Sequence, residues 1–305
     1  MTPALAIIVA TRDREAMLGR MLASALAMRD VQRATLELVV ADDGSRDTTR
    51  LVVAEAARHH GGIRYLAVPD RGTSHALNQA IRATSAPVLA FLDDDVVFDP
   101  GWLVAVEGYF TRERAAAAQG TIRIPPDAAD DPAIVAAVER WRTIPRCDLG
   151  PHATESRSLI GANMLIARET FARAGLFDER LGPGAAGACE DTELALRIRA
   201  TGARIGYIPD AIVYHAVEPT RLNLEYFRML HLRRGRSRVY YKHAGLASRI
   251  LPNLGLAGLR LIATAPIRRG VTHARALGRW YHYRGMLEAH RAARLPGGAP
   301  PLQVT

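Results

Sequence analysis

The residues of this 305-residue sequence that could do chemistry include acidic clusters directly after short apolar runs. The densest cluster is Asp93-Asp94-Asp95, which follows the apolar residues 87–92. Three successive carboxylates repel one another, and such a cluster persists when something cationic neutralises it. We interpret it as the site of a divalent ion shared between one or two carboxylates and substrate phosphates. The structural alternative is an acidic turn that caps the next helix.

A second cluster, Asp42-Asp43-Gly44-Ser45, follows the apolar residues 36–41 and precedes a helical pattern. A carboxylate here can accept hydrogen bonds from a base or ribose that lies across the strand ends. Gly44 lets the backbone turn sharply, because glycine lacks a Cβ atom. The alternative interpretation is an ordinary turn between a strand and a helix.

Glu190-Asp191 follows a glycine-rich loop at residues 182–188 and opens a helix. The helix dipole favours carboxylates at this end, so a capping role is one interpretation. The functional interpretation is a general base that takes a proton from an acceptor hydroxyl, under a loop that closes over the substrates. His215 ends a short apolar run; alone it would more often be structural, but beside the acidic cluster we expect it to bind metal.

These residues need a scaffold that brings the ends of several strands together. In the first hundred residues, apolar runs of strand length alternate with segments of helical spacing. We predict strands at residues 5–10, 36–41, 63–68 and 87–92, and helices at residues 14–28, 47–58 (with Asp47 as N-cap) and 74–83. Such alternation predicts an α/β fold with a mainly parallel sheet and helices on both faces. Ligands of these sheets bind beyond the carboxyl ends of the strands, where both acidic clusters fall.

The pattern continues with less regular spacing. We predict helices at residues 102–110, 132–141, 168–174 and 191–201, and strands at residues 159–167, 203–208 and 212–215. Residues 125–157 are rich in Pro, Asp and Ala, and we expect a variable, partly mobile region there.

The order of the motifs resembles that of glycosyltransferase family 2. The matching stretches are IVATRDR, VVADDGSRDTT, GTSHALNQAIRATSAPVLAFLDDDVVFDPGWL, IGANMLIARETFARAGLFDERLGPG and EDTELALRIRATGARIGYIPDAIVYH. They extend over about residues 4–216. The resemblance implies a GT-A fold, inversion at the anomeric carbon and a nucleotide-sugar donor. UDP is the commonest nucleotide in the family, with dTDP and GDP as alternatives.

The resemblance also implies roles for residues in the donor site. Thr11 and Asp43 would contact the nucleotide, and Asp42 is a weaker candidate for the same pocket. Gly72 would lie near the ribose and diphosphate. Gly161-Ala162-Asn163 matches a stretch that lines the donor sugar and acceptor.

Other matched positions imply the catalytic groups. Asp93 and Asp95 match the ends of the family's DxD motif, with Asp94 between them also in the donor site. Asp95 would bind Mn²⁺ or Mg²⁺ directly, and His215 would complete the metal site. Asp191 matches the catalytic base, and Glu190 is the next candidate for that role.

Two departures from the family pattern have consequences. Cys189 precedes the Glu-Asp pair where glycine is common, so the geometry of this loop is in question. The Gln-x-x-Arg-Trp motif of processive members is incomplete, because Ala276 stands before Arg279-Trp280 in place of glutamine. No long membrane helix is present in the sequence either, so we expect transfer of a single sugar.

The net charge of +9 is unevenly distributed along the chain. Residues 220–305 contain 16 Lys+Arg and 2 Asp+Glu, whereas residues 1–219 carry a net charge of −5. We therefore predict a catalytic domain at residues 1–219, with a nucleotide-binding half at about 1–100 and an acceptor half at about 101–219, and a basic helical segment at residues 220–305. The apolar stretch at residues 246–267 is flanked by arginines that include Arg268 and Arg269.

The basic segment has three interpretations. Helices on an anionic membrane surface would suit a lipid-linked or cell-surface glycan acceptor. Packing on the catalytic domain or a homo-oligomer contact is the second. Nucleic-acid binding is the third, and we reject it because no such motif is present. The sequence lacks a signal peptide pattern and has two isolated cysteines, so we expect a cytoplasmic protein, peripheral on the inner face of the cell membrane in the first interpretation.

Rival functions lack the motifs they need. A sugar-1-phosphate nucleotidyltransferase would have a glycine-rich loop after the first strand, where this sequence has Thr11-Arg12-Asp13-Arg14. A dinucleotide-dependent oxidoreductase would have Gly-x-Gly-x-x-Gly at that place. A catalytically inactive scaffold that binds membrane or partner enzymes is the remaining alternative, and the complete carboxylate set argues against it.

Overall fold

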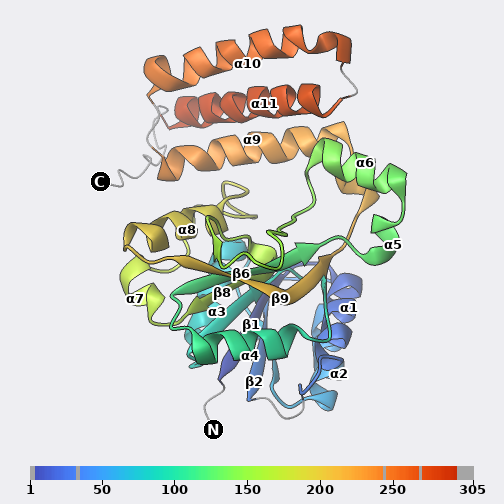
Figure 1. Ribbon diagram of the computed structural model, residues 1–305. Helices are drawn as coiled ribbons and strands as arrows, with labels where there is room; N and C mark the ends of the chain where they lie inside the picture. Colours follow the sequence, from blue (N-terminus) through green and yellow to red (C-terminus); the bar gives the residue numbers. More distant parts are fainter. Residues whose placement is uncertain (1–3, 32–34, 243–244, 268–269, 294–305) are drawn as a thin grey trace. The chain divides into compact units, whose positions relative to one another are not determined.

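The computed structural model of the protein describes residues 4–31, 35–242, 245–267 and 270–293 (Figure 1). The chain forms two compact units. The first unit contains residues up to Pro125, Pro145–Glu179 and Glu190–Ala216; the second contains Pro126–Ile144, Arg180–Cys189 and the chain from Val217 onward. The predicted boundary at residue 219 remains a proposal, since two earlier segments also join the second unit.

The N-terminal half of the first unit is a parallel sheet in the strand order β3-β2-β1-β4. Its strands are β1 (Leu5–Thr11), β2 (Leu36–Asp42), β3 (Ile63–Ala67) and β4 (Val88–Leu92). The helices between them are α1 (Glu15–Leu26), α2 (Thr49–His59) and α3 (Thr73–Ala83). The predicted α/β alternation is confirmed for this half.

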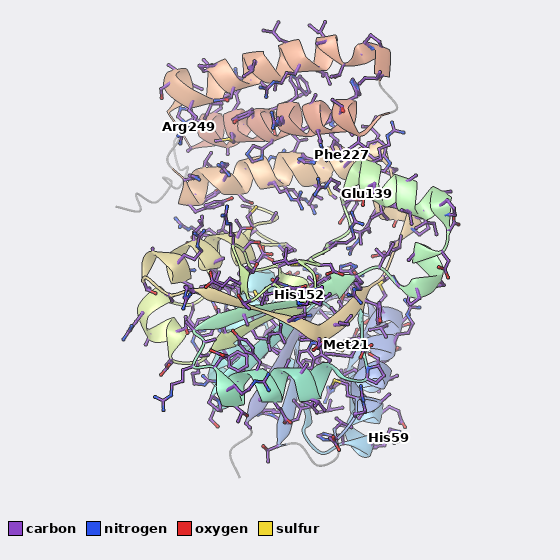
Figure 2. The ribbon with its side chains drawn as sticks, viewed as in Figure 1. Met21, His59, Glu139, His152, Phe227 and Arg249 are labelled. Atoms are coloured by element: carbon purple, nitrogen blue, oxygen red, sulfur yellow. The ribbon has the colours of Figure 1, made fainter. Side chains whose placement is uncertain are left out.

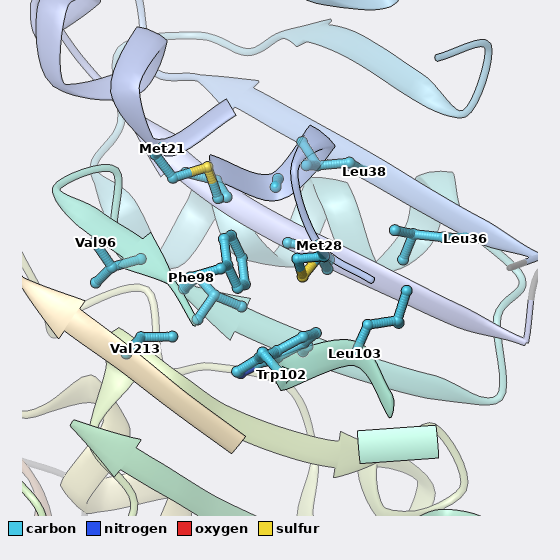
Figure 3. Close-up of a cluster of buried hydrophobic side chains, with 14 of the residues drawn as sticks. Met21, Met28, Leu36, Leu38, Val96, Phe98, Trp102, Leu103 and Val213 are labelled. Atoms are coloured by element: carbon cyan, nitrogen blue, oxygen red, sulfur yellow. The ribbon is translucent and has the colours of Figure 1, made fainter. Parts of the chain in front are cut away.

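Apolar residues on both faces of these strands explain why helices cover both sides of the sheet. Along β1, Ile7 and Val9 pack into one core cluster with α1, α2 and α4 (Trp102–Arg112), part of which is drawn in Figure 3. The alternate residue Ile8 packs into another cluster with α3, α7 (Thr170–Ala174) and α8 (Glu190–Ala200). A strand that is buried on both faces has a continuous run of apolar residues, as residues 5–10 of β1 have.

Beyond β4 the sheet is mixed. Its strands are β5 (Val96–Phe98), β6 (Ala117–Arg123), β7 (Glu155–Ser156), β8 (Met164–Ala167) and β9 (Ile205–His215). Strand β8 runs antiparallel to β4 and β6, β6 runs parallel to β9, and β5 and β7 run antiparallel to β9. The sheet order ends β4-β8-β6-β9-β5.

Several predicted elements need correction in this half. Residues 203–208 and 212–215 belong to the single strand β9, whose register with β6 shifts between Gly120 and Thr121. The strand predicted at 159–167 begins only at Met164, after the 3₁₀ turn Gly161–Asn163. Strands β5 and β6 were not predicted.

The predicted N-cap of α2 is also wrong. Thr48 is the N-cap residue, and α2 begins at Thr49. The Asp47 carboxylate instead accepts hydrogen bonds from the backbone N–H groups of Glu15 and Thr49, at 3.0 Å each. Asp47 therefore links the first turns of α1 and α2.

The second unit is helical. Its helices are α5 (Pro126–Ala129), α6 (Pro132–Trp141), α9 (Leu224–Tyr241), α10 (Leu251–Ala263) and α11 (Val271–Ala292), with short turns at Pro219–Arg221, Leu246–Ile250 and Ala265–Ile267. Helix α11 lies between α9 and α10 (Figure 1). Phe227 of α9, labelled in Figure 2, lies 5.3 Å from the ring centroid of Trp141 on α6. Arg268, Arg269 and the tail after Leu295 lie outside the described residues.

The register shift in β6 generates a prediction about stability. A Cβ atom on Gly120 would lie 2.3 Å from Asn163 Nδ2 and 2.8 Å from the carbonyl oxygen of Ala211. Gly120→Ala should therefore lower the free energy of unfolding by about 1–3 kcal/mol, the usual cost of overpacking a core. Denaturant titration would measure this change. Gly61→Ala is the matched control, since nothing lies within 4 Å of its added Cβ atom, and equal stabilities for the two variants would contradict the prediction.

Candidate active site

The carboxyl ends of β1, β2 and β4 meet at one edge of the sheet, and the first acidic residues follow them there. Thr11 ends β1 in register with Asp42 at the end of β2. The Thr11 hydroxyl donates a hydrogen bond to Asp94 Oδ2 over 2.7 Å, which joins β1 to the acidic turn after β4. The topology thus brings together two motifs that lie 83 positions apart in the sequence.

The pairing of β5 with β9 places a histidine beside the acidic turn. Val96 is the register partner of His215, and the N–H of Ala216 donates to the Asp95 carbonyl over 2.9 Å. His215 Nε2 consequently lies 3.2 Å from Asp95 Oδ1 and 3.7 Å from Asp93 Oδ2. One ligand atom from each of these three residues lies within 4.8 Å of the others.

This trio fits a divalent cation. His215 is fully buried, and its Nδ1 lies 2.9 Å from the carbonyl oxygen of Ala216. If Nδ1 donates its proton to that carbonyl, the lone pair of Nε2 faces the two carboxylates, and a second ring contact of this kind is typical of metal-binding histidines. Among the described residues Nε2 has no hydrogen-bond partner. A lone pair directed at carboxylate oxygens is repulsive unless a cation or a proton lies between them.

The electrostatics of His215 agree with this arrangement. Burial by itself would lower the pKa of the imidazole, but the carboxylates of Asp93 and Asp95 outweigh burial and hold the pKa above its ordinary value. The protein therefore stabilises positive charge at this position.

Arg14 supplies positive charge to the rest of the acidic turn, a role that local sequence patterns did not predict. Its Nε lies 3.0 Å from Asp94 Oδ1, and its Nη2 lies 2.7 Å from Asp95 Oδ2. Burial raises the pKa of Asp94 to about 7, while Arg14 and the Thr11 hydroxyl act in the opposite direction. Arg14 precedes α1, so the loop after β1 contributes a cation to the same edge.

The Asp43 carboxylate is hydrogen-bonded to the backbone at Gly72, and the Asp42 carboxylate is hydrogen-bonded to Tyr65 and Ser45. The Asp43 carboxylate accepts hydrogen bonds from the N–H groups of Arg71 and Gly72, each at 3.0 Å. Gly72 has a φ of 97°, which favours glycine, and precedes α3. Asp42 is buried and accepts from the Tyr65 hydroxyl over 2.6 Å and from the Ser45 N–H over 2.8 Å. Both carboxylates are therefore hydrogen-bonded within the fold, and a contact of either with a nucleotide stays a prediction.

The side-chain amide of Asn163 is hydrogen-bonded to other residues of the first unit. Its buried amide donates to the carbonyl oxygens of Thr121 and Ala211 over 2.9 and 2.8 Å, and accepts from Trp102 Nε1 over 3.0 Å. The side chain thus bridges the shifted register of β6 and β9. Its predicted place in the donor site stays a prediction.

Gly161 connects the acidic turn to the Glu-Asp pair at the start of α8. Its N–H donates to Asp191 Oδ2 over 3.1 Å, and its added Cβ atom would lie 3.9 Å from Asp93 Oδ1. Asp191 Oδ1 accepts from the N–H and hydroxyl of Thr192. Burial is the main cause that raises the pKa of Asp191, and it raises the pKa of Glu190 together with the adjacent charge of Asp191.

Cys189 has the backbone conformation that glycine usually supplies. Its φ is 72°, in the left-handed region, which costs a non-glycine residue roughly 1–2 kcal/mol. The backbone at Cys189 thus has a conformation that glycine would adopt at lower cost.

A polar network around Glu179 was missed by the sequence analysis. The Glu179 carboxylate lies 3.0 Å from both His75 Nδ1 and Asn78 Nδ2, and 3.4 Å from an Arg71 guanidinium nitrogen. The hydrogen bond from Asn78 is the main cause that lowers the pKa of Glu179, followed in effect by His75 and Arg71. The network joins α3 to the segment after α7, and its partners lie about a hundred residues apart.

Comparison with known proteins places this geometry in a family. A validoxylamine A glucosyltransferase of Streptomyces hygroscopicus subsp. limoneus is 39% identical over 106 residues, which cover 34% of this chain and 23% of that protein. A glucosyl-dolichyl phosphate glucuronosyltransferase of Haloferax volcanii is 26% identical over 198 residues, which cover 63% and 62% of the two chains. The chain thus spans less than two thirds of the length of these curated relatives.

A solved structure and a family model are also those of glycosyltransferases. The mannosyltransferase of Pyrobaculum calidifontis, in complex with GDP-Man and Mn²⁺, has the same fold, with a TM-score of 0.56, 20% identity and coverage of 97% of this chain and 77% of that one. The model described as "Glycosyltransferase like family 2" matches residues 3–237. The chain belongs to glycosyltransferase family 2 and has the GT-A fold of that family.

Proposed function

We propose that the protein is an inverting glycosyltransferase that moves one sugar from a nucleoside-diphosphate sugar to an acceptor hydroxyl. The observation that carries the proposal is the convergence of Asp93, Asp95 and His215 at the sheet edge that also holds Asp191. A cation site and a half-buried carboxylate base are the two groups that this reaction uses.

The proposed residues have distinct tasks. Asp191 removes the proton from the acceptor hydroxyl, and the hydroxyl oxygen attacks the anomeric carbon from the face opposite the diphosphate. The bond between that carbon and the diphosphate oxygen breaks, and the diphosphate leaves with the electron pair. Thr11, Asp43 and Gly72 hold the nucleotide, and Asp94 helps to fix Thr11. The Gly161 N–H orients Asp191 for the proton transfer.

Asp93, Asp95 and His215 would hold Mn²⁺ or Mg²⁺. When bound, such an ion acts as a Lewis acid and offsets the charge that grows on the diphosphate. The Pyrobaculum calidifontis mannosyltransferase is in complex with GDP-Man and Mn²⁺, which supports a metal and a nucleotide sugar in this fold. UDP, dTDP and GDP donors can be distinguished by thermal-shift measurements on a panel of nucleotide sugars with and without Mn²⁺.

The acceptor is proposed to be a lipid-linked or cell-surface glycan precursor. The name of the Haloferax volcanii relative, which includes a dolichyl phosphate acceptor, supports the lipid-linked class. The alternative of an inactive scaffold conflicts with the retained carboxylates and His215. A hydrolysis assay for nucleotide-sugar turnover separates the two, because a scaffold would release no nucleotide above background.

The metal site generates one prediction. Chelation with EDTA should abolish transfer, and Mn²⁺ or Mg²⁺ should restore it. Asp95→Ala should weaken nucleotide-sugar binding at least about tenfold in the presence of Mn²⁺, because the diphosphate loses its counter-charge. Calorimetric titration would measure this affinity, with the exposed Asp130→Ala as control. Full activity in excess chelator would contradict the proposed site.

The base generates another prediction. Asp191→Asn is nearly isosteric but cannot accept the proton, so kcat should fall roughly 100-fold or more. The affinity for the donor should be retained, which steady-state kinetics and a binding titration would establish together. A kcat close to that of the wild-type enzyme would refute the assignment, and Glu190→Gln would then test the next candidate.

The raised pKa of Asp191 predicts a pH dependence. Only the deprotonated carboxylate can act as the base, so kcat/KM should fall as the pH drops through this pKa. Because burial raises the pKa, the fall should occur at higher pH than the ordinary aspartate value of about 3.9. The pH profile should be measured at several Mn²⁺ concentrations. A fall in kcat/KM that comes from loss of metal binding would shift with the Mn²⁺ concentration, whereas a fall that comes from protonation of Asp191 would not. A limb at the ordinary value would contradict the prediction.

A further inference from the structure

Helix α10 is apolar around almost its whole circumference. Of its 13 residues, LPNLGLAGLRLIA, only Arg260 is charged. A helix of a water-soluble domain usually has one apolar stripe and one polar face, whereas a helix that is apolar all round is buried by something. The second apolar face of α10 therefore needs an explanation.

One face of α10 packs against α11, with Ala257 buried and Leu254 and Leu261 partly buried. The opposite face is open. Its side chains are Leu251, Leu256, Leu259 and Ile262, of which Leu259 and Ile262 are 67% and 73% exposed. Since α11 lies between α9 and α10, the neighbouring helices leave this face free (Figure 1). Ile267, just beyond the helix, is 54% exposed and extends the apolar surface.

The charges around α10 indicate what covers it. Residues 220–305 contain 16 Lys+Arg and 2 Asp+Glu, and exposed Arg249 and Arg260 lie before and within the helix. Arg249 is labelled in Figure 2. A second copy of this chain would bring two strongly basic segments together, which repulsion disfavours. An anionic lipid surface instead offers an apolar interior for the leucines and negative headgroups for the arginines.

The length of the helix decides how it would meet the membrane. Thirteen residues at about 1.5 Å each extend over roughly 20 Å, whereas the hydrocarbon core is about 30 Å thick. Among the described residues, none of the helices has the length and apolar character needed to cross a bilayer. Helix α10 can therefore lie along the interface but cannot span it.

We propose that α10 is a membrane-docking helix that lies in the interface of an anionic bilayer. Leu251, Leu256, Leu259 and Ile262 insert below the headgroups, while Arg249 and Arg260 contact lipid phosphates. Arg236 of α9 pairs with Glu288 of α11 over 2.8 Å. The proposal goes beyond the proposed transfer reaction and does not depend on it.

Co-sedimentation of the full chain with vesicles tests the proposal. The wild-type protein should sediment with vesicles of phosphatidylcholine and phosphatidylglycerol, and less with pure phosphatidylcholine or in high salt. The double variant Leu259→Ser/Ile262→Ser should reduce the partition coefficient at least about tenfold, because both side chains lose their insertion into lipid. The double variant Arg249→Ser/Arg260→Ser should reduce the partition coefficient on anionic vesicles but not on vesicles of pure phosphatidylcholine.

A control variant removes exposed apolar residues elsewhere. Leu51→Ser/Val104→Ser changes side chains that are 67% and 48% exposed on α2 and α4, and it should leave the partition coefficient unchanged. Circular dichroism would check that each variant is folded, and Mn²⁺-dependent nucleotide binding would check the first unit separately. Wild-type protein that stays in the supernatant with anionic vesicles at low salt would overturn the proposal. A wild-type dimer that the Leu259→Ser/Ile262→Ser substitutions dissociate would also overturn the proposal, because the apolar face would then be a contact between two copies of the chain.

Discussion

Repulsion between carboxylates at one sheet edge is the constraint that the site must satisfy. Asp93, Asp94 and Asp95 follow β4, and the half-buried pair Glu190 and Asp191 lies across Gly161 from them. Two like charges about 5 Å apart repel by roughly 3 kcal/mol at an effective dielectric constant of about 20. An arrangement of this kind persists only with compensating positive charge and hydrogen bonds, which the surrounding elements supply.

The compensation comes from separate parts of the chain. Arg14 pairs with Asp94 and Asp95, and Thr11 donates to Asp94. His215 reaches Asp95 because β5 and β9 pair in a register that places it there. Asn163 bridges the register shift between β6 and β9, the strand that carries His215. Thus residues with no direct part in the chemistry determine where the acidic groups lie, and a cation would complete the balance of charge.

The sequence predicted the parts of this site that are local. The DDD cluster, the Glu-Asp pair and the parallel strands β1 to β4 follow from short patterns, because apolar runs and adjacent charges are visible within ten residues. Strand β5 escaped prediction because it has only three residues, and β6 because AAQGTIR lacks an apolar run. The roles of Arg14, Asn163 and Asp42 depend on partners far along the chain, such as Trp102 and Tyr65, which local patterns do not reveal.

A crystal structure of the protein with a nucleoside diphosphate and Mn²⁺ would test the central claim most directly. Anomalous diffraction would locate the manganese ion independently of the protein ligands. The account predicts one peak about 2.0–2.3 Å from a carboxylate oxygen of Asp95 and from His215 Nε2, with diphosphate oxygens on its open side. A bound nucleotide with the manganese elsewhere, or with His215 still facing the carboxylates and no ion between them, would contradict it.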